Sequence, residues 1–178
     1  MKRIGVFCAA SDLLEPTFYE EAYALGVWMG NQRLTLVYGG ANSGLMEAVA
    51  RGVHEGGGHI VGVVPRILEE RRRESIYLDE IIRCEDLTER KTIMQEQSDA
   101  FLALPGGIGT LDEVFTVMAS ASIGYHVKPV LLYNSSGFWN DLFEWFSRLD
   151  RQHFINRPLS DYLHEVRSLS DLARLLSV

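Results

Sequence analysis

The sequence predicts an α/β fold in which a single doubly wound parallel sheet carries helices on both faces. Short apolar runs alternate along the chain with longer amphipathic segments, which is the order of strands and helices in such folds. The apolar runs are continuous, as expected for parallel strands that are buried on both faces. The 178 residues, 47% hydrophobic and 23% charged, suit one domain spanning residues 1–178.

The first part of the chain is predicted to form three strands separated by two helices. The run RIGVFCA at Arg3–Ala9 predicts a buried strand. Pro16–Asn31 predicts a helix with its proline in the first turn, where the missing N–H is tolerated. The run LTLVY at Leu34–Tyr38 predicts the second strand, and a glycine turn leads from it into a helix at Leu45–Glu55. The apolar run at Ile60–Val64 predicts the third strand.

The rest of the chain continues the same alternation. The charged stretch LEERRRES at Leu68–Ser75 predicts a mobile surface loop, and Asp79–Cys84 predicts a further strand. The remaining predicted elements, in order, are a helix at Glu89–Gln97, a strand at Ala100–Leu104, a helix at Thr110–Ser122, a strand at Pro129–Tyr133, a helix at Phe138–Leu149 and a short helix at Ser170–Leu176. No repeat, linker or low-complexity segment interrupts them.

Charge and composition argue against several classes of partner. A formal net charge of −7 and a pI of about 5.2 disfavour non-specific binding of nucleic acid or of an anionic membrane. The N-terminal run is too short for a signal peptide, and no window approaches the ~18 apolar residues that span a bilayer. Cys8 and Cys84 are too few for a disulfide framework, so a reducing cytoplasm is the expected location.

Three stretches follow predicted strands at the edge where doubly wound sheets bind ligands. They are CAAS at Cys8–Ser11, YGGANSGLM at Tyr38–Met46 and LPGGIGTLDE at Leu104–Glu113. Glycine allows a backbone to approach a ligand closely, and a helix N-terminus offers unpaired N–H groups and a positive dipole end. Two such glycine turns in one sheet predict a phosphate or carboxylate held between them.

The familiar nucleotide motifs do not match these turns. A Walker loop needs Lys followed by Ser or Thr after its last glycine, but Leu45 and Met46 follow Gly44. A dinucleotide fingerprint needs a glycine where Asp112 stands, and the following strand ends at Asn134 instead of an acid. Both an NTPase and an NAD(P)-dependent dehydrogenase are therefore disfavoured.

Two structural alternatives compete with a ligand site at the second glycine turn. Glycine turns also join strands to helices where no ligand binds. Thr110 and Glu113 have the spacing of a capping box, in which the hydroxyl and the carboxylate bond the free N–H groups of a helix start. Three glycines within four residues exceed what a cap requires, which favours a ligand.

A second candidate feature is DLTERKTIM at the start of the helix before the Ala100–Leu104 strand. Asp86 or Thr88 is the expected N-cap, so Arg90 and Lys91 fall in the first turn. Cations there oppose the helix dipole, at ~0.3–1 kcal/mol each. Either this is a solvated turn offset by Glu89, or the two cations hold an anion at the same sheet edge.

These motifs together resemble the LOG (Lonely Guy) family of cytokinin riboside 5′-monophosphate phosphoribohydrolases, often labelled possible lysine decarboxylases. The family's PGGxGTxxE motif is present at Pro105–Glu113. Its Arg-Lys pair, followed by Met and Ser-Asp-Ala-Phe, is present as Arg90, Lys91, Met94 and Ser98–Phe101. The similarity also includes VYGGANSGLM, IVGVVP and IGYHVKP, and it extends from Ile4 to about Phe154.

The resemblance implies a Rossmann-like fold, a homodimer with the site near its interface, and hydrolysis of the N-glycosidic bond of a nucleoside 5′-monophosphate. The substrate would be a cytokinin nucleotide or AMP, with no cofactor and no metal. By position, the resemblance assigns Glu113 and Arg90 as catalytic. The substrate- and phosphate-binding candidates are Lys91, Gly106, Gly107, Gly109, Thr110, Gly39, Gly40, Ser11 and Met94.

The chemistry agrees with these residue types. N-glycoside cleavage passes through a cationic, oxocarbenium-like sugar. A nearby carboxylate can stabilise this positive charge or activate the water molecule that attacks the sugar. A pyridoxal-phosphate decarboxylase would need a Schiff-base lysine. The only lysines are Lys2, Lys91 and Lys128, and none is well placed for that role, so lysine decarboxylation is disfavoured. The five histidines form no metal-ligand spacing.

Some positions depart from the family pattern. Thr88 and Glu89 precede Arg90, and Ala119-Ser120 and Ser122 replace residues that lie near the base or the interface in relatives. The family's carboxylate after IVGVVP is not assigned, because Glu69, Glu70 and Glu74 all compete for it. The base preference therefore stays open.

Two other classes of function remain open. A nucleotide or pterin-cofactor carrier on the same fold would keep the glycine turns but would not need Glu113. An interaction protein would use the aromatic stretch FWNDLFEWF at Phe138–Phe146 as a partner surface, although its helical spacing favours a core role.

Overall fold

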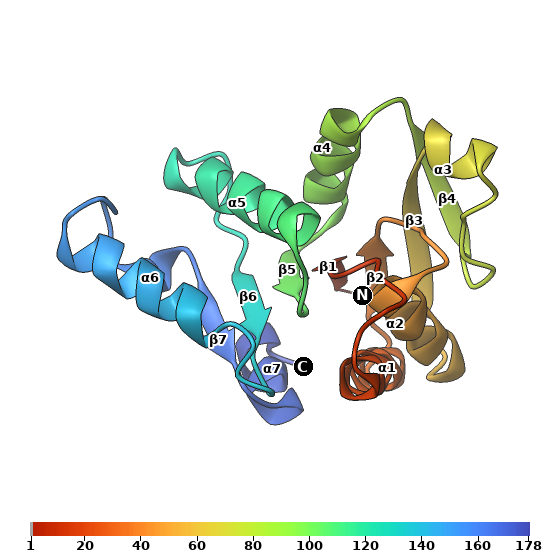
Figure 1. Ribbon diagram of the computed structural model, residues 1–178, viewed down its shortest axis with the longest axis horizontal. Coiled ribbons are helices and arrows are strands. Elements are labelled where there is room, and N and C mark those ends of the chain that lie inside the picture. The colour runs from red at the N-terminus through yellow and green to blue at the C-terminus, as the bar shows by residue number, and fades with distance from the viewer. Residues whose placement is uncertain (1) are drawn as a thin grey trace.

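The computed structural model describes residues 2–178 and contains one seven-stranded sheet (Figure 1). All neighbouring strands pair in parallel, in the order β4-β3-β2-β1-β5-β6-β7. The strands are β1 (Arg3–Phe7), β2 (Thr35–Tyr38), β3 (His59–Pro65), β4 (Glu80–Cys84), β5 (Ala100–Ala103), β6 (Val130–Tyr133) and β7 (His164–Val166). The predicted α/β class with a parallel sheet is confirmed.

Helices cover both faces of the sheet (Figure 1). Three helices, α1 (Pro16–Asn31), α2 (Gly44–Glu55) and α7 (Leu169–Leu176), pack their apolar side chains into one core cluster with one face of the sheet. On the other face lie α4 (Leu87–Gln97), α5 (Ile108–Ser122) and α6 (Asn140–Arg151), which share the second core cluster. Each strand of the sheet centre is thus buried on both faces, which explains its continuous apolar sequence.

The strand order reverses between β1 and β5. From β1 the chain moves outward through β2, β3 and β4, then returns to β5 beside β1 and moves outward in the other direction. The loops that leave β1 and β5 therefore diverge and open a crevice at their carboxyl ends. Before they diverge, the first residues of the two loops are joined by backbone hydrogen bonds. Ala9 N–H donates to the Pro105 carbonyl (3.1 Å), and Leu104 N–H donates to the Phe7 carbonyl (3.0 Å).

Three short elements were not expected from the sequence. A five-residue helix, α3 (Arg66–Glu70), occupies the start of the predicted loop at Leu68–Ser75, so that prediction is wrong for its first residues. The short β7 adds a seventh strand, and a 3₁₀ turn at Leu159–Asp161 precedes it. No helix between residues 2 and 178 is long and apolar enough to cross a membrane.

The aromatic stretch at Phe138–Phe146 is divided between core and surface. Trp139 and Phe146 are buried in the second core cluster, whereas Phe138 and Trp145 are 45% and 39% exposed. Core packing therefore accounts for much of its aromatic content.

Candidate functional site

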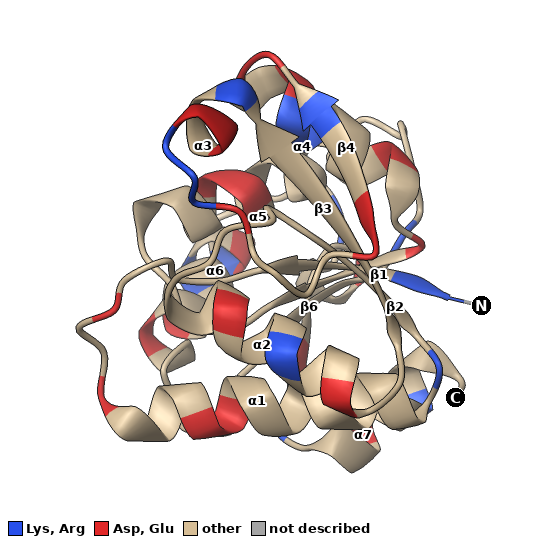
Figure 2. Cartoon of the chain, turned by 90° about the vertical axis from the view of Figure 1, so that its right-hand side faces the viewer, with Lys and Arg blue, Asp and Glu red and all other residues tan. Residues whose placement is uncertain are grey.

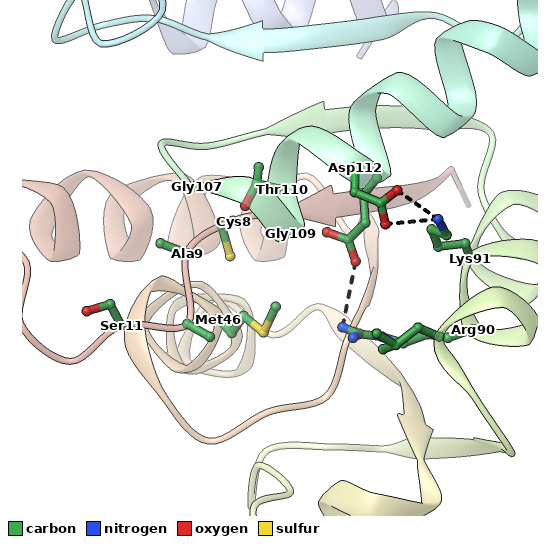
Figure 3. Close-up of a pocket in the computed structure, with 13 residues that line it drawn as sticks. Cys8, Ala9, Ser11, Met46, Arg90, Lys91, Gly107, Gly109, Thr110 and Asp112 are labelled. Carbon is green, nitrogen blue, oxygen red and sulfur yellow. Dashed lines mark hydrogen bonds and ion pairs between the residues drawn. The ribbon is translucent and has the colours of Figure 1, made fainter.

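A cavity of about 400 Å³ lies at the point where the strand order reverses (Figure 3). Its walls come from the loop after β1, the start of α2, the first turns of α4 and the start of α5. The lining residues are Cys8, Ala9, Ala10, Ser11, Met46, Leu87, Arg90, Lys91, Gly107, Gly109, Thr110, Asp112 and Glu113. The cavity thus joins the two sequence motifs, which are some twenty residues apart in the chain.

Arg90 and Glu113 both line this cavity and form an ion pair within it. Arg90 Nη2 lies 3.8 Å from Glu113 Oε1, and only 11% and 10% of the two side chains are exposed. Burial raises the pKa of Glu113 to about 7, with Asp112 adding to the rise and Arg90 and Lys91 opposing it. A carboxyl with a pKa near neutrality, beside a guanidinium in a cleft, is typical of acid–base and electrostatic catalysis.

Gly39 makes room for the Arg90 side chain. A Cβ atom at Gly39 would overlap with the guanidinium of Arg90, so any other residue there would displace the guanidinium from this position. The adjacent Gly40 has a positive φ of 72°, and a Cβ there would lie 2.5 Å from a methyl group of Val64. The first glycine turn therefore positions Arg90 and does not itself line the 400 Å³ cavity.

Arg90 retains unused hydrogen-bonding capacity. Its Nε atom is buried and has no hydrogen-bond partner among residues 2–178. Buried donors in native proteins are nearly always paired, with protein, water or ligand. A ligand oxygen in the cavity would supply the missing acceptor.

Lys91 is held by Asp112 at the rim of the cavity (Figure 3). Its Nζ atom donates to both carboxylate oxygens of Asp112 at 2.9 Å, and 54% of the Asp112 side chain is exposed. This pair connects α4 to α5. It also places a carboxylate next to Glu113 that raises the pKa of Glu113.

The second glycine turn differs from the predicted capping box. Helix α5 begins at Ile108 with Gly107 as N-cap, and no side chain bonds the free N–H groups of its first turn. Thr110 is 3% exposed and packs against Gly106, where a Cβ would overlap with the threonine side chain. The prediction that Thr110 caps the helix is therefore wrong, because the helix starts two residues earlier.

Gly107 and Gly109 leave space beside the open helix N-terminus. A Cβ atom at either position would meet no neighbouring protein atom within 4 Å. Neither glycine is required by packing, yet both line the cavity. The geometry gives a ligand direct access to N–H groups that carry the positive end of the helix dipole.

The start of α4 is firmly capped. The Asp86 carboxylate accepts hydrogen bonds from the N–H groups of Thr88 (2.8 Å) and Glu89 (2.9 Å), and the Glu89 carboxylate accepts one from Glu85 N–H (2.7 Å). Of the two expected caps, Asp86 is thus the observed one. Because such a cap contributes about 1 kcal/mol, it offsets the cost of placing Arg90 and Lys91 near a positive helix end.

Of the two remaining predicted site residues, Ser11 and Met94, only one lines the cavity. Ser11 lines the cavity, but Met94 lies in the second core cluster with 1% exposed and does not line it. Cys8, Met46 and Leu87 line the cavity and were not among the predicted site residues. Cys8 and Met46 belong to the candidate stretches after the first two strands, and Leu87 lies three residues before Arg90, so these positions are the signal that could have identified them.

The acidic residues after β3 do not reach the cavity. Glu69 pairs with Arg83 at 2.9 Å, and Glu70 pairs with Arg66 at 3.0 Å. Glu74 does not line the cavity either. Instead, arginines of this segment line a second cavity of about 590 Å³, which we call the arginine cavity. Its lining residues are Ala10, Ala41, Ser43, Met46, Leu68, Arg71, Arg73 and Arg90.

The described residues offer few side chains that could bind a metal ion or form a Schiff base. Among residues 2–178, no three His, Cys, Asp or Glu side chains cluster closely enough to hold a metal ion. Lys91 is paired with Asp112, and Lys128 Nζ donates to the carbonyl of Gln95 at 2.6 Å. Both lysines are thus engaged in structural contacts.

Comparison with known proteins gives a consistent family. Residues 46–176 match the model of the family described as possible lysine decarboxylase. Cytokinin riboside 5′-monophosphate phosphoribohydrolase LOG7 of Arabidopsis thaliana is 38% identical over 98% of this chain and 81% of its own length. LOG5 of the same plant is 41% identical over 86% of this chain and 68% of its own length.

Solved structures share the fold. The molybdenum cofactor binding protein of Rippkaea orientalis is 25% identical, with a TM-score of 0.75, over 99% of this chain and 95% of that protein. The same architecture thus occurs in proteins with different described functions.

Proposed function

Because the chain belongs to the LOG family of cytokinin riboside 5′-monophosphate phosphoribohydrolases, also described as possible lysine decarboxylases, we propose that it hydrolyses the N-glycosidic bond of a nucleoside 5′-monophosphate. The products are a free base and ribose 5-phosphate. The observation that carries the proposal is the buried Arg90–Glu113 pair beside an open helix N-terminus in one cavity.

The 5′-phosphate binds at the start of α5. The uncapped N–H groups of this helix face a cavity in which Gly107 and Gly109 present no side chain. Backbone donors and the helix dipole favour a phosphate there, and Lys91 adds a positive charge at the rim. A fixed phosphate also fixes the ribose beside the catalytic groups. The reaction between them then becomes effectively intramolecular, which lowers its entropic cost.

Glu113 acts on the anomeric carbon. It lies one helical turn after the phosphate-binding turn of α5, and as a carboxylate it stabilises the positive charge that develops on the sugar. It also accepts a proton from the attacking water. Its pKa of about 7 places this proton transfer near neutral pH.

Arg90 binds the departing side of the substrate. Its unpartnered Nε and its Nη2 near Glu113 offer donors in a buried site, where charge-assisted hydrogen bonds are strong. In the net reaction the glycosidic C–N bond breaks, the water hydroxyl bonds to the anomeric carbon, and the base nitrogen gains a proton. No electron carrier is needed.

A second candidate function is a nucleotide or pterin-cofactor carrier. The overall likeness to the cofactor binding protein of Rippkaea orientalis favours it. A carrier has no need of a buried carboxylate with a raised pKa, which makes the enzyme the better supported of the two. A carrier would retain its ligand through purification and leave it intact.

We propose a homodimer in the cytoplasm as the working form. Large apolar side chains are exposed along α5 and the loop after it, including Ile108 (88%), Ile123 (66%), Tyr125 (77%) and Val127 (99%). A second copy of the chain would bury them. Ile108 lies between two cavity-lining glycines, so such an interface would adjoin the site.

Product analysis tests the function. The purified protein is incubated with AMP and with N6-isopentenyladenosine monophosphate, and free base and ribose 5-phosphate are measured by chromatography. Equimolar release of both products from at least one nucleotide supports the proposal. Retention of unaltered nucleotide without turnover would support the carrier instead.

A further inference from the structure

The arginine cavity adjoins the catalytic cavity on the side away from α5. The two cavities share Ala10, Met46 and Arg90, so Arg90 stands between them. A nucleotide whose phosphate lies at the start of α5 and whose sugar lies beside Glu113 would extend its base toward the arginine cavity. The residues of that cavity would then contact the far end of such a ligand.

The charge of the arginine cavity is one-sided. Arg71, Arg73 and Arg90 line it, and none of its lining residues is acidic, although the protein carries a net charge of −7. Within residues 2–178, neither Arg71 nor Arg73 forms an ion pair with an acidic side chain. Of the acids in this segment, Glu69 pairs with Arg83 and Glu70 with Arg66, and Glu74 does not line the cavity. Figure 2 shows the basic run after α3 as a continuous blue stretch.

The backbone of this segment is fixed against the first glycine turn. Asn42 N–H donates to the Arg73 carbonyl and Ser75 N–H donates to the Gly40 carbonyl, both at 2.8 Å, and Ala41 forms a β-bridge with Glu74. Arg72, between the two lining arginines, has a positive φ of 53° and does not line the cavity. The local turn thus directs Arg71 and Arg73, but not Arg72, to the cavity.

We propose that Arg71 and Arg73 form, with Arg90, a second anion subsite, so that the preferred ligand is a nucleotide with a second negatively charged group besides its 5′-phosphate. This inference rests on the proposed function for the position of the nucleotide. The second group of the ligand is a carboxylate or a phosphate, because guanidinium groups form charge-assisted hydrogen bonds with both. An apolar N6 chain would leave these charges without partners.

Equilibrium binding to nucleotides that differ only in the second group tests the subsite. The probes are AMP, N6-isopentenyladenosine monophosphate, N6-(1,2-dicarboxyethyl)adenosine monophosphate and adenosine 3′,5′-bisphosphate. At least one of the two probes that carry a second anionic group is expected to bind about tenfold or more tightly than AMP, the size of one charge-assisted hydrogen bond. The dicarboxyethyl probe reports an anion on the base and the bisphosphate reports one on the sugar.

Matched variants separate the subsite from general charge effects. Arg71→Gln with Arg73→Gln should abolish the preference for the second anion and leave AMP binding within about twofold. Arg72→Gln removes the same charge from the same segment and should retain the preference. Equal binding of all four probes, or a preference that survives the double substitution or is lost with Arg72→Gln, would overturn the inference.

The outcomes also distinguish this inference from the proposed function. Hydrolysis of AMP together with equal binding of all probes would leave the function standing and remove the anion subsite. A strong preference for the second anion that depends on Arg71 and Arg73, without any hydrolysis, would support the subsite and overturn the proposed function. Failure of every probe to bind would overturn both.

Discussion

Glu113 and Arg90 carry opposite charges in a site where about a tenth of each side chain is exposed. Burial disfavours the Glu113 carboxylate more than Arg90 favours it, so its pKa rises to about 7 instead of falling below its ordinary 4.5. The Glu113 carboxyl therefore exchanges a proton near neutral pH, whereas an exposed glutamate would stay fully charged there. The same charge balance makes Asp112 a tuning residue, since its carboxylate raises the pKa of Glu113.

The pH dependence of the reaction follows from this shift. If the Glu113 carboxylate is the active form, kcat/KM for AMP rises with pH and levels off above about 7. Asp112→Asn removes a negative charge, so the Glu113 pKa falls and the inflection moves to lower pH. Glu144→Gln, an exposed acid on α6, serves as control and should leave the profile unchanged. An inflection that stays in place in Asp112→Asn would assign it to another group, such as the substrate phosphate.

At the scale of elements, the site forms where the starts of α4 and α5 converge. The Asp86 cap holds the start of α4, whose fourth and fifth residues are Arg90 and Lys91, and the Lys91–Asp112 pair ties α4 to α5. Helix α5 contributes its uncapped N-terminus. Stability alone favours a capping side chain there, so its absence is consistent with an N-terminus reserved for a ligand.

Gly109→Ala tests whether the start of α5 binds phosphate. Alanine is a better helix former than glycine by about 0.5–1 kcal/mol, and its Cβ would meet no protein atom within 4 Å, so the Tm should stay equal or rise. The added methyl group enters the cavity, so the Kd for AMP should increase at least tenfold. Thr116→Ala, on the same helix outside the cavity, is the control. Unchanged AMP affinity in Gly109→Ala would show that the glycine has no ligand role.

At the scale of the whole molecule, the fold class and six strands could be predicted, five of them because each is a buried, continuous apolar run. The exposed edge strand β4 has only the pair Ile81-Ile82 as an apolar signal. The seventh strand escaped prediction, since β7 has only three residues and Val166 alone is fully buried in it. The glycine turns and the Arg-Lys pair were visible as motifs. The support of Arg90 by Gly39 and the arginine cavity were not, because they depend on contacts between segments far apart in sequence.

The proposed homodimer gives a prediction at the same scale. Ile123→Glu places a charge in the exposed apolar surface after α5, so it should convert a dimer to a monomer in analytical ultracentrifugation. Leu13→Glu changes another apolar residue that is 95% exposed, outside this surface, and should leave the dimer intact. A wild-type protein that sediments as a monomer at micromolar concentration would contradict the homodimer.

Glu113 is proposed to catalyse the hydrolysis of a nucleotide held at the start of α5. The most direct measurement is single-turnover release of adenine from AMP by the wild-type protein and by Glu113→Gln, with AMP affinity measured in parallel. We expect release to be at least a hundredfold slower in the variant, with a Kd for AMP within a few-fold of the wild-type value. Release at an undiminished rate by Glu113→Gln would contradict it.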